Sequence, residues 1–415
     1  MNLHKDFGDS AKLFIIDEVS MFGQADLLKL NLFLQAAFPV TCTEPFGEAY
    51  IIFLGDFYQL KPIGKKPLYD MNDELAKSLW IRDTEACVIL SQQMRHVEQV
   101  NSEIDYAALN MRARTGTITN EDILALNSRV LWNTTGCEFS LPSFASKIPP
   151  LTPIAVFTNA AVDIINNNRL KAHNMPIVNS WAKHTFTARN GVRSQVSCLN
   201  ANAMKLDALV QLSIAAPVML IDNIATELGL VNGSIGIIHD IMYDTSGQDG
   251  IVNPQANREE ACESQLAIPI VLVKFPSYTG QSFITGVDHI VPIHYVKENN
   301  ETNTFFRLQL PLRLAYAMTI HKCQGMTLSS LALDLSNATA RGLSYVGISR
   351  VRMLDGLTFR NAVIMRNFTG AAANENERKL HKEFGFIAVE YECLEKIFEN
   401  TKLRYANWFN FNLNI

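Results

Sequence analysis

Apolar and polar residues follow two rhythms along the chain, and the change between them predicts its organisation. Residues 13–16 form a short continuous apolar run, and together with Lys12 they predict a buried strand over residues 12–16. Apolar residues then recur at helical spacing from Leu27 to Phe38, which predicts a helix over residues 24–38. A second apolar run, AYIIFLGDFYQL, follows. Strand, helix and strand in this order predict a parallel crossover unit.

The same α/β rhythm continues to about residue 216. CVILSQQMR predicts a third strand, and EDILALNSRVL predicts a short amphipathic helix. TPIAVFTNAAVDIINNNRL predicts a strand, a turn and a helix.

From about residue 217 to residue 310 the rhythm becomes that of an all-β segment. Short runs (PVMLI, GSIGIIHDI, IPIVLVKF and FFRLQLPL) are separated by polar stretches rich in Gly and Asn. DTSGQDGIVNPQANREEACESQ predicts an exposed loop. The α/β rhythm returns at AYAMTIHKCQG and SLALDLS, so the β segment is predicted to be an insertion in a second α/β domain. The last residues predict a helix.

Length and composition limit the number of domains and the class of protein. A chain of 415 residues is too long for one ordinary core, so two or three domains are expected. The net charge of -5 gives no global basic signature, but a local basic groove is enough to bind nucleic acid. The seven cysteines are scattered and contain no C-x-x-C pair, which argues against zinc and secreted disulfides and fits a reducing compartment.

Targeting signals are not apparent in the sequence. No apolar run reaches the length of a membrane span, and MNLHKDFGDS lacks the apolar region of a signal peptide. We therefore expect no membrane association.

Carboxylates follow both strands of the first crossover unit. Asp17 and Glu18 end the first strand, and Asp56 and Gln59 follow the second. Both strand ends lie at the carboxyl edge of one sheet, where open α/β sheets bind ligands. A carboxylate there can hold Mg²⁺, and a neighbouring Glu can activate water. Each motif alone could be a solvent-facing turn, but two in one unit favour a nucleotide site.

Cationic residues lie farther along the chain. Arg95 follows the third predicted strand, and Arg350 lies in YVGISRVR. Guanidinium groups stabilise charge on a transferred phosphoryl group, although either arginine alone could form a surface ion pair. HKCQGMT places His321 and Lys322 in a Gly-containing turn with donors for DNA phosphates.

The phosphate-binding loop pattern G-x-x-x-x-G-K-[ST] is absent from the sequence. Gly64-Lys65 lacks the upstream Gly and the following Ser or Thr. Such a loop belongs to a strand-helix unit of roughly 30 residues or more, and only 16 residues precede Asp17. We expect that the loop is missing and that ATP binds this chain weakly.

The ordered set IIDEVSM, FGEAYIIFLGDFYQLKPI, LSQQMR, PVMLIDNIATELGLVNGSIG, LPLRLAYAMTIHKCQGMT and GLSYVGISRVRMLDGL resembles the Pif-type DNA helicases, which are superfamily-one enzymes related to RecD. The resemblance covers about residues 13–365. It implies ATP and Mg²⁺ as cofactors, 5′-to-3′ translocation on single-stranded DNA, unwinding of forked or structured duplexes, and work in DNA repair, recombination and telomere maintenance. A nucleus or mitochondrion is the implied location.

The resemblance also assigns roles to residues, each by its place in a motif. Asp17 is expected to hold Mg²⁺, and Glu18, Gln59, Arg95 and Arg350 are expected to be catalytic. The expected contacts to the nucleotide and to DNA are Asp17, Asp56, Gln324 and Gly325 for the nucleotide and Thr158, Asn159, His321 and Lys322 for DNA.

The implied fold is α/β. Two RecA-like parallel-sheet domains are expected, the first truncated at its N-terminus (residues 1–88) and the second formed by residues 89–216 and 311–368. A small SH3-like β domain (residues 217–310) is inserted in the second, and residues 369–415 form a tail. Three readings of function stay open. The chain is a helicase without its phosphate-binding loop, an inactive remnant, such as one from a rolling-circle transposon, that still binds single-stranded DNA, or a protein-interaction scaffold.

Overall fold

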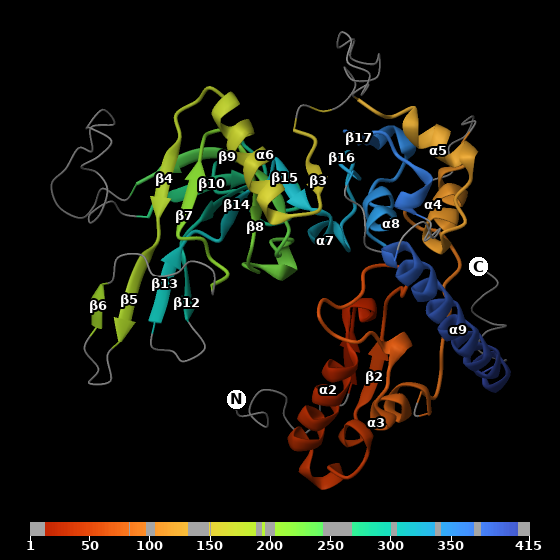
Figure 1. The fold of residues 1–415 in the computed structure, drawn as a ribbon. Coiled ribbons are helices and arrows are strands. Elements are labelled where there is room, and N and C mark those ends of the chain that lie inside the picture. The colour runs from red at the N-terminus through yellow and green to blue at the C-terminus, as the bar shows by residue number, and fades with distance from the viewer. Residues whose placement is uncertain are drawn as a thin grey trace. The chain divides into compact units, whose positions relative to one another are not determined.

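The computed structural model describes residues 13–82, 84–96, 104–131, 149, 151–187, 193–195, 204–243, 268–299, 305–336, 342–368 and 375–405. The chain divides into two compact units (Figure 1). Unit 1 comprises Met1–Ile148 and Cys323–Ile415, and unit 2 comprises Pro149–Lys322. The four-part domain division given above remains a prediction.

The first crossover unit of unit 1 forms as predicted. β1 (Leu13–Ile16) and β2 (Tyr50–Phe53) pair in parallel, and α2 (Gln24–Ala37) connects them. Three short 3-10 helices lie in the same stretch: η1 (Val19–Met21), η2 (Pro39–Thr41) and η3 (Pro45–Glu48).

The two faces of this small sheet differ. Phe14, Ile51 and Phe53 pack against a core that contains the fully buried Leu27 and Leu34 of α2. The opposite face is apolar and exposed, and it carries Leu13, Ile15, Tyr50 and Ile52. Among the described residues, therefore, only one face of the sheet is covered.

The remaining elements of unit 1 are mainly helical. They are η4 (Leu68–Asp70), α3 (Glu74–Lys77), the π-helix η5 (Ser78–Arg82), α4 (Tyr106–Thr115), α5 (Asn120–Asn127), β16 (Leu331–Leu333), α8 (Leu343–Ile348), η9 (Leu354–Gly356), β17 (Leu357–Phe359), η10 (Met365–Asn367) and α9 (Glu375–Arg404). α7 (Ile320–Cys323) ends at the first residue of this second stretch. β16 and β17 pair in parallel.

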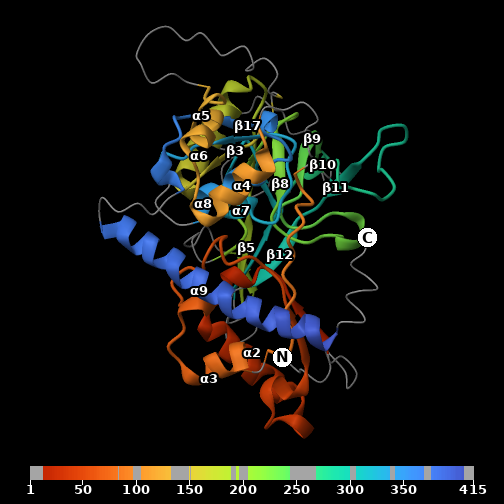
Figure 2. The same ribbon diagram turned by 90° about the vertical axis from the view of Figure 1, so that its right-hand side faces the viewer.

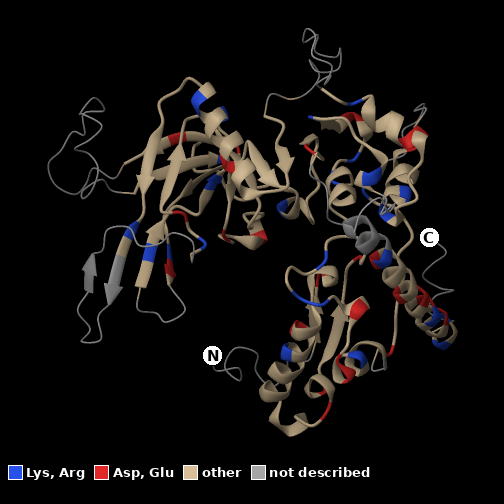
Figure 3. Cartoon of the chain, in the orientation of Figure 1, with Lys and Arg blue, Asp and Glu red and all other residues tan. Residues whose placement is uncertain are grey.

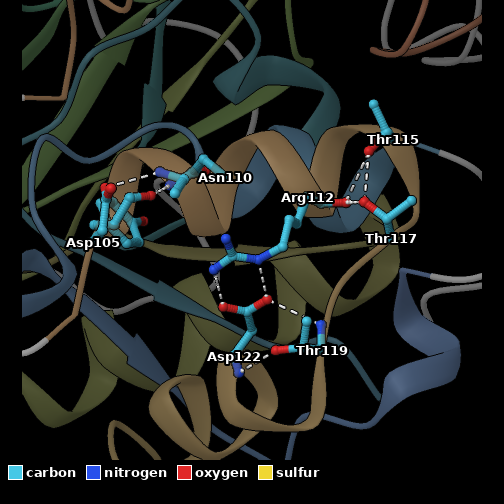
Figure 4. A network of polar contacts seen from close by, with 9 residues as sticks. Asp105, Asn110, Arg112, Thr115, Thr117, Thr119 and Asp122 are labelled. Atoms are coloured by element: carbon cyan, nitrogen blue, oxygen red, sulfur yellow. Dashed lines mark hydrogen bonds and ion pairs between the residues drawn. The ribbon is translucent and has the colours of Figure 1, made fainter.

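Helices α4 and α5 are joined by a charged pair. Arg112 donates from Nε and Nη2 to the carboxylate of Asp122, at 2.7 and 2.6 Å (Figure 4). Asp122 also accepts from the backbone N–H of Thr119, whose hydroxyl accepts from Asp122 N in return. This reciprocal capping box begins α5 where the amphipathic pattern EDILALNSRVL begins.

The C-terminal helix α9 confirms the helical prediction for the end of the chain and packs on the first crossover unit (Figure 2). Its Ile387 lies in the same core as Leu27 and Leu34. Its Glu390 accepts from Trp80 Nε1 at 2.7 Å in a buried hydrogen bond. Acidic and basic side chains both occur along the helix (Figure 3). Its packing therefore depends on one apolar face and a few specific polar contacts.

The third predicted strand, CVILSQQMR, is wrong. The structure assigns no strand over residues 87–95, and this described segment pairs with no described strand. Leu90 is 88% exposed and Met94 is 81% exposed. An apolar run becomes a strand only where a neighbouring strand supplies backbone partners, and here none does.

Unit 2 is dominated by strands, and its longest described helix is α6 (Asn159–Ala172). The strands are β3 (Ile154–Val156), β4 (Val178–Trp181), β5 (Lys183–Thr187), β6 (Arg193–Gln195), β7 (Leu209–Leu212), β8 (Pro217–Leu220), β9 (Ile235–Met242), β10 (Ile270–Lys274), β11 (Ile290–Ile293), β12 (Val296–Asn299), β13 (Phe305–Gln309), β14 (Leu312–Leu314) and β15 (Ala317–Thr319). The 3-10 helix η8 (Thr226–Leu228) lies between β8 and β9.

These strands form antiparallel sheets, with one parallel pair. The sheet orders are β11-β10-β9-β8-β14, β12-β13-β5-β6 and β4-β7, and β15 runs parallel to β3. The described part of residues 217–310 holds only strands and a 3-10 helix, as the sequence pattern predicted. The β-rich region nevertheless begins earlier, at β4, because β4 pairs with β7, β5 pairs with β13, and β6 pairs with β5. The predicted loop DTSGQDGIVNPQANREEACESQ lies outside the described residues.

Candidate functional site

The acidic end of β1 has a strained backbone. Asp17 is exposed and accepts a hydrogen bond from Glu18 N at 2.8 Å. Glu18 lies in the left-handed region, with φ 54° and ψ 46°, which is uncommon for a residue other than glycine. Strain of this kind is held by surrounding structure and is concentrated at functional sites.

Glu18 meets residues that lie more than 300 positions away in the sequence. Gln324 Nε2 donates to Glu18 Oε2 at 2.8 Å. Gly325 is also close, because a Cβ atom built on it would lie 3.6 Å from Glu18 Oε1. The structure therefore brings together three of the residues singled out from the sequence.

Two arginines lie beside this group. Arg350 is 2% exposed, and its guanidinium donates to Val346 O and to the Ser349 hydroxyl at 2.8 and 2.7 Å. Arg95 donates to Ser349 O at 3.1 Å. Among the described residues, no carboxylate lies within ion-pair distance of Arg350. It is a buried cation held by neutral acceptors.

The electrostatics of Arg350 reflect this environment. Burial, and then the nearby charge of Arg95, lower the pKa of Arg350 to about 10, while Tyr345 and Glu18 act in the opposite direction. Burial and the charges of Arg95 and Arg350 also lower the pKa of His96. Buried charges in proteins are normally paired, so two guanidinium groups near each other form a place where an anion would be stabilised.

Asp56 is held differently from Asp17. Its carboxylate accepts two hydrogen bonds from Arg114, at 3.0 and 2.8 Å, one from the Tyr391 hydroxyl at 3.0 Å, and one from Tyr58 N at 3.1 Å. The Arg114 guanidinium also lies 4.4 Å from the centroid of the Tyr58 ring. These contacts occupy both oxygens of Asp56, and its expected role at the nucleotide stays a prediction.

Sequence reasoning missed Arg114 and Tyr391. Arg114 lies on α4 and Tyr391 on α9, and neither belongs to a motif with a chemical signature. Only the packing of α9 on the first crossover unit brings Tyr391 to Asp56, across 335 residues of sequence.

The loop after β2 packs tightly against the segment that follows β1 and the segment that precedes α8. Gly55 has φ 151°, and a Cβ atom on it would lie 2.7 Å from Val19 N, so a side chain there would separate the two loops. Gly342 has φ 80°, and a Cβ atom on it would lie 2.6 Å from Gln59 O. Gln59 is therefore held next to the start of α8.

Unsatisfied polar atoms test whether these residues suit a nucleotide with Mg²⁺. Ser20 Oγ, Gln59 Oε1, Gln324 Oε1 and Ser344 Oγ are buried without a hydrogen-bond partner among the described residues. Buried polar atoms are normally paired. The two serine hydroxyls could donate to phosphate oxygens, and the two glutamine carbonyl oxygens could accept from water. The described residues contain no cluster of three or more His, Cys, Asp or Glu that could hold a metal. Mg²⁺ commonly uses one or two carboxylates and the substrate phosphates, so Asp17 suits it.

The residues expected to contact DNA lie in unit 2. The Thr158 hydroxyl caps α6 by accepting from Ala161 N at 3.2 Å. Asn159 and Lys322 both line one pocket. His321 lies next to Lys322, and burial lowers its pKa. No helix in the described part of the chain is long and apolar enough to cross a membrane.

The chain is similar to known DNA helicases. The model of the family described as PIF1-like helicase matches residues 3–122. The ATP-dependent DNA helicase PIF7 of Trypanosoma brucei brucei is 24% identical, over 93% of this chain and 39% of its own length. The human ATP-dependent DNA helicase PIF1 is 28% identical, over 83% of this chain and 45% of its own length. The chain thus spans less than half of either relative.

Solved structures share the fold. The crystal structure of Pif1 helicase from Candida albicans matches with a TM-score of 0.62 and 21% identity, over 90% of this chain and 76% of the other. The crystal structure of Bacteroides Pif1 bound to ssDNA matches with a TM-score of 0.55 and 18% identity, over 86% of this chain and 72% of the other.

Proposed function

We propose that this chain, which belongs to the PIF1-like helicase family, forms most of the motor of an ATP-dependent DNA helicase. In this proposal it moves 5′ to 3′ along single-stranded DNA and opens forked or structured duplexes. DNA repair, recombination and telomere maintenance, in the nucleus or mitochondrion, are the settings that the proposal implies.

One observation carries the proposal. Glu18, Gln324 and the buried cation Arg350 lie in the same part of unit 1, although they are far apart in sequence. A carboxylate, an amide and unpaired guanidinium groups are what ATP hydrolysis requires at the terminal phosphate. A structural role for Arg350 would be better served by a carboxylate partner, and the described residues provide none.

Each residue then has a chemical task. Glu18 accepts the proton of the attacking water, and Asp17 holds Mg²⁺ through its exposed carboxylate. Arg95 and Arg350 stabilise negative charge as it develops on the phosphoryl group. Gln59 and Gln324, each with a buried carbonyl oxygen that lacks a partner among the described residues, orient water. When bound, ATP with Mg²⁺ supplies the phosphoanhydride bond whose hydrolysis drives movement.

The phosphate-binding loop must come from another segment in this proposal, because the sequence lacks G-x-x-x-x-G-K-[ST]. The exposed apolar face of the β1–β2 sheet, formed by Leu13, Ile15, Tyr50 and Ile52, supports this idea. A further strand and helix would cover that face. The missing motif also favours the second candidate, a DNA-binding protein that does not hydrolyse ATP.

The test is to supply the loop. A strand–loop–helix segment with the phosphate-binding motif, taken from a relative, is fused ahead of Leu13, and ATP hydrolysis is measured with and without single-stranded DNA. We expect hydrolysis that DNA stimulates. Glu18→Gln should abolish hydrolysis but leave ATP bound, and Arg350→Ala should slow it by about 10³-fold.

The exposed Arg352 gives a matched control, because Arg352→Ala removes the same charge two residues away. A fusion that binds ATP and loses no more rate with Arg350→Ala than with Arg352→Ala would overturn the assignment of the site. A folded fusion that binds single-stranded DNA and cannot hydrolyse ATP would favour the second candidate.

A further inference from the structure

Unit 2 contains a pocket of about 630 Å³, which is large enough for a small organic ligand. One face of α6 forms one of its walls, through Asn159, Val162, Asp163, Asn166 and Asn167. These positions are spaced as neighbours along one helix face. Four of the five side chains are polar, so this wall is made to contact a polar group.

The strands β7, β8, β14 and β15 supply mostly apolar residues to the pocket. They include Val210, Met219, Leu312 and Met318. None of the lining residues in this described region is aromatic. A flat ligand would therefore be recognised by its edge on the α6 side and by apolar contact on the other, without aromatic stacking.

Two cations lie on the rim, and they differ in one respect. Arg313 is neutralised by Asp207, with Nε and Nη2 donating to the two carboxylate oxygens at 2.6 and 2.8 Å. Lys322 has no ion-pair partner among the described residues. Lys322 is exposed; desolvation and then the charge of Arg313 lower its pKa, while Asp207 and Asp163 act in the opposite direction. A bound anion such as a phosphate would relieve both effects.

The polar residues of α6 that line the pocket differ in their contacts. Asn166 is committed to the backbone, because it donates to Leu314 O at 3.2 Å and accepts from Ala317 N at 2.8 Å. Asp163 and Asn167 are exposed, so a ligand in the pocket can reach both side chains. A carboxylate and a carboxamide one helical turn apart offer an acceptor next to a group that both donates and accepts.

We propose that this pocket binds one nucleotide whose base carries an exocyclic amino group, with Asp163 and Asn167 contacting the base edge and Lys322 the phosphate. Cytosine fits this pair well, because its amino group donates to a carboxylate and its ring nitrogen accepts from an amide. Thymine presents a carbonyl oxygen in place of the amino group, and a carboxylate repels it.

The nucleotide has two possible sources with the same chemistry. It is a base turned out of a bound single strand, in which case the inference rests on the proposed function, or it is a free mononucleotide. The strand is the source we favour, since Asn159 and Lys322, expected to contact DNA, lie on the wall of the same pocket.

The experiment measures the affinity of the full chain for oligo-deoxycytidine and oligo-deoxythymidine of equal length, by fluorescence anisotropy at neutral pH and fixed salt. We expect about tenfold tighter binding of oligo-deoxycytidine. Asp163→Asn should remove most of that preference, and Asn167→Ala should weaken it. Asn168→Ala is the matched control, because Asn168 is an exposed residue of the same helix outside the pocket and should leave the preference unchanged.

Titration with dCMP distinguishes the two sources. A cytosine preference that depends on Asp163 supports the pocket as a site for a strand nucleotide. Binding of dCMP that depends on Asp163, with no binding of either oligonucleotide, supports a free nucleotide and overturns the DNA-binding function instead. Equal affinity for both oligonucleotides, together with no Asp163-dependent binding of dCMP, overturns the inference and leaves the proposed function standing. Thermal melting of each variant checks that it is folded, and Asn167→Ala carries the test if Asp163→Asn does not fold.

Discussion

Arg114 links the C-terminal helix α9 to the rest of unit 1, and replacing Arg114 should destabilise the packing of that helix selectively. Arg114→Met keeps the aliphatic stem and removes two hydrogen bonds to Asp56 and one to the Tyr391 hydroxyl. The stacking of the guanidinium on the rings of Tyr58 and Tyr391 is lost with them. The change leaves the Asp56 carboxylate with the Tyr391 hydroxyl and Tyr58 N as its remaining donors.

The expected cost follows from burial. Removing one partner of a fully buried ion pair costs about 3–5 kcal/mol. The side chains of Arg114 and Asp56 are each 18% exposed, so water can solvate part of the carboxylate that remains. Tyr391 and Tyr58 N still donate to it. We therefore expect a loss of about 2–3 kcal/mol, concentrated where α9 meets Asp56.

Hydrogen exchange of the full chain, read at individual peptides by mass spectrometry, measures this effect. A loss of about 2–3 kcal/mol should speed exchange of the α9 amides by roughly 30- to 150-fold, because each 1.4 kcal/mol is a factor of about ten. Amides of β9 and β10 in unit 2 should keep their rates.

Arg112→Met is the matched control, since Arg112 lies on the same helix and pairs with Asp122 of α5 instead (Figure 4). It should speed exchange in α5 and leave α9 unchanged. The reasoning fails if Arg114→Met leaves the exchange of α9 as it was, or if Arg112→Met speeds it equally.

Two further predictions follow from single contacts. Lowering the pH from about 7.5 to about 5.5 should destabilise unit 2, because burial and the charge of Arg307, which donates to His184 Nε2 at 2.9 Å, lower the pKa of His184. The pKa of His184 in the folded chain lies below the usual value of about 6.5. The stability that this neutral histidine contributes is therefore fully present above a pH of about 6.5 and is lost as the pH falls toward the folded pKa. Thermal melts of the unmodified chain should show this loss, and melts of His184→Gln should not. Gly342→Ala should lower the free energy of unfolding, measured with urea, by about 2–3 kcal/mol, because its Cβ would meet Gln59 O at a positive φ. Gly64 also has a positive φ but has open space around it, so Gly64→Ala should lower the free energy of unfolding by less.

Local patterns predicted the elements that are stabilised by near neighbours. The apolar run of β1 and the helical spacing of α2 contain the signals that build them, since strand and helix here pack on each other. The run CVILSQQMR carries a similar signal and is not a strand, because the chain offers it no described partner. An apolar pattern shows that a segment is able to form a strand, and backbone pairing with a neighbouring strand decides whether it does.

The early start of the β-rich region has the same origin. β5 reads KHTFT, a short and largely polar segment with weak strand signal. It becomes a strand because β13, more than 100 residues later, pairs with it. Such pairing depends on the whole fold, and no window of the sequence around residue 185 contains it.

The candidate site shows where motif reasoning is strong and where it fails. Motifs singled out Glu18, Gln324 and Arg350, and the structure joins Glu18 and Gln324 by a hydrogen bond. The motifs also placed Arg350 and Asp56 in one site, although the two charges have different partners in the structure. Asp56 is saturated by Arg114 and other donors, whereas Arg350, more buried than Arg114, has no carboxylate partner among the described residues.

This contrast is the physical basis for separating structural charges from functional ones in this chain. A charge that the fold uses for stability is paired by the fold itself, as Asp56 is through its two bonds from Arg114. A buried charge with only neutral acceptors costs stability, and such charges mark candidate functional sites. Arg350 meets this criterion, but so does the fully buried Arg307 of unit 2, which donates to His184 Nε2 and Leu206 O. Arg350 differs because Glu18 lies near it and is bonded to Gln324. Lys322 is exposed, and it offers an accessible cation without an ion pair within the described ranges. In our proposals, Arg350 contacts the terminal phosphate of ATP and Lys322 contacts the phosphate of one nucleotide.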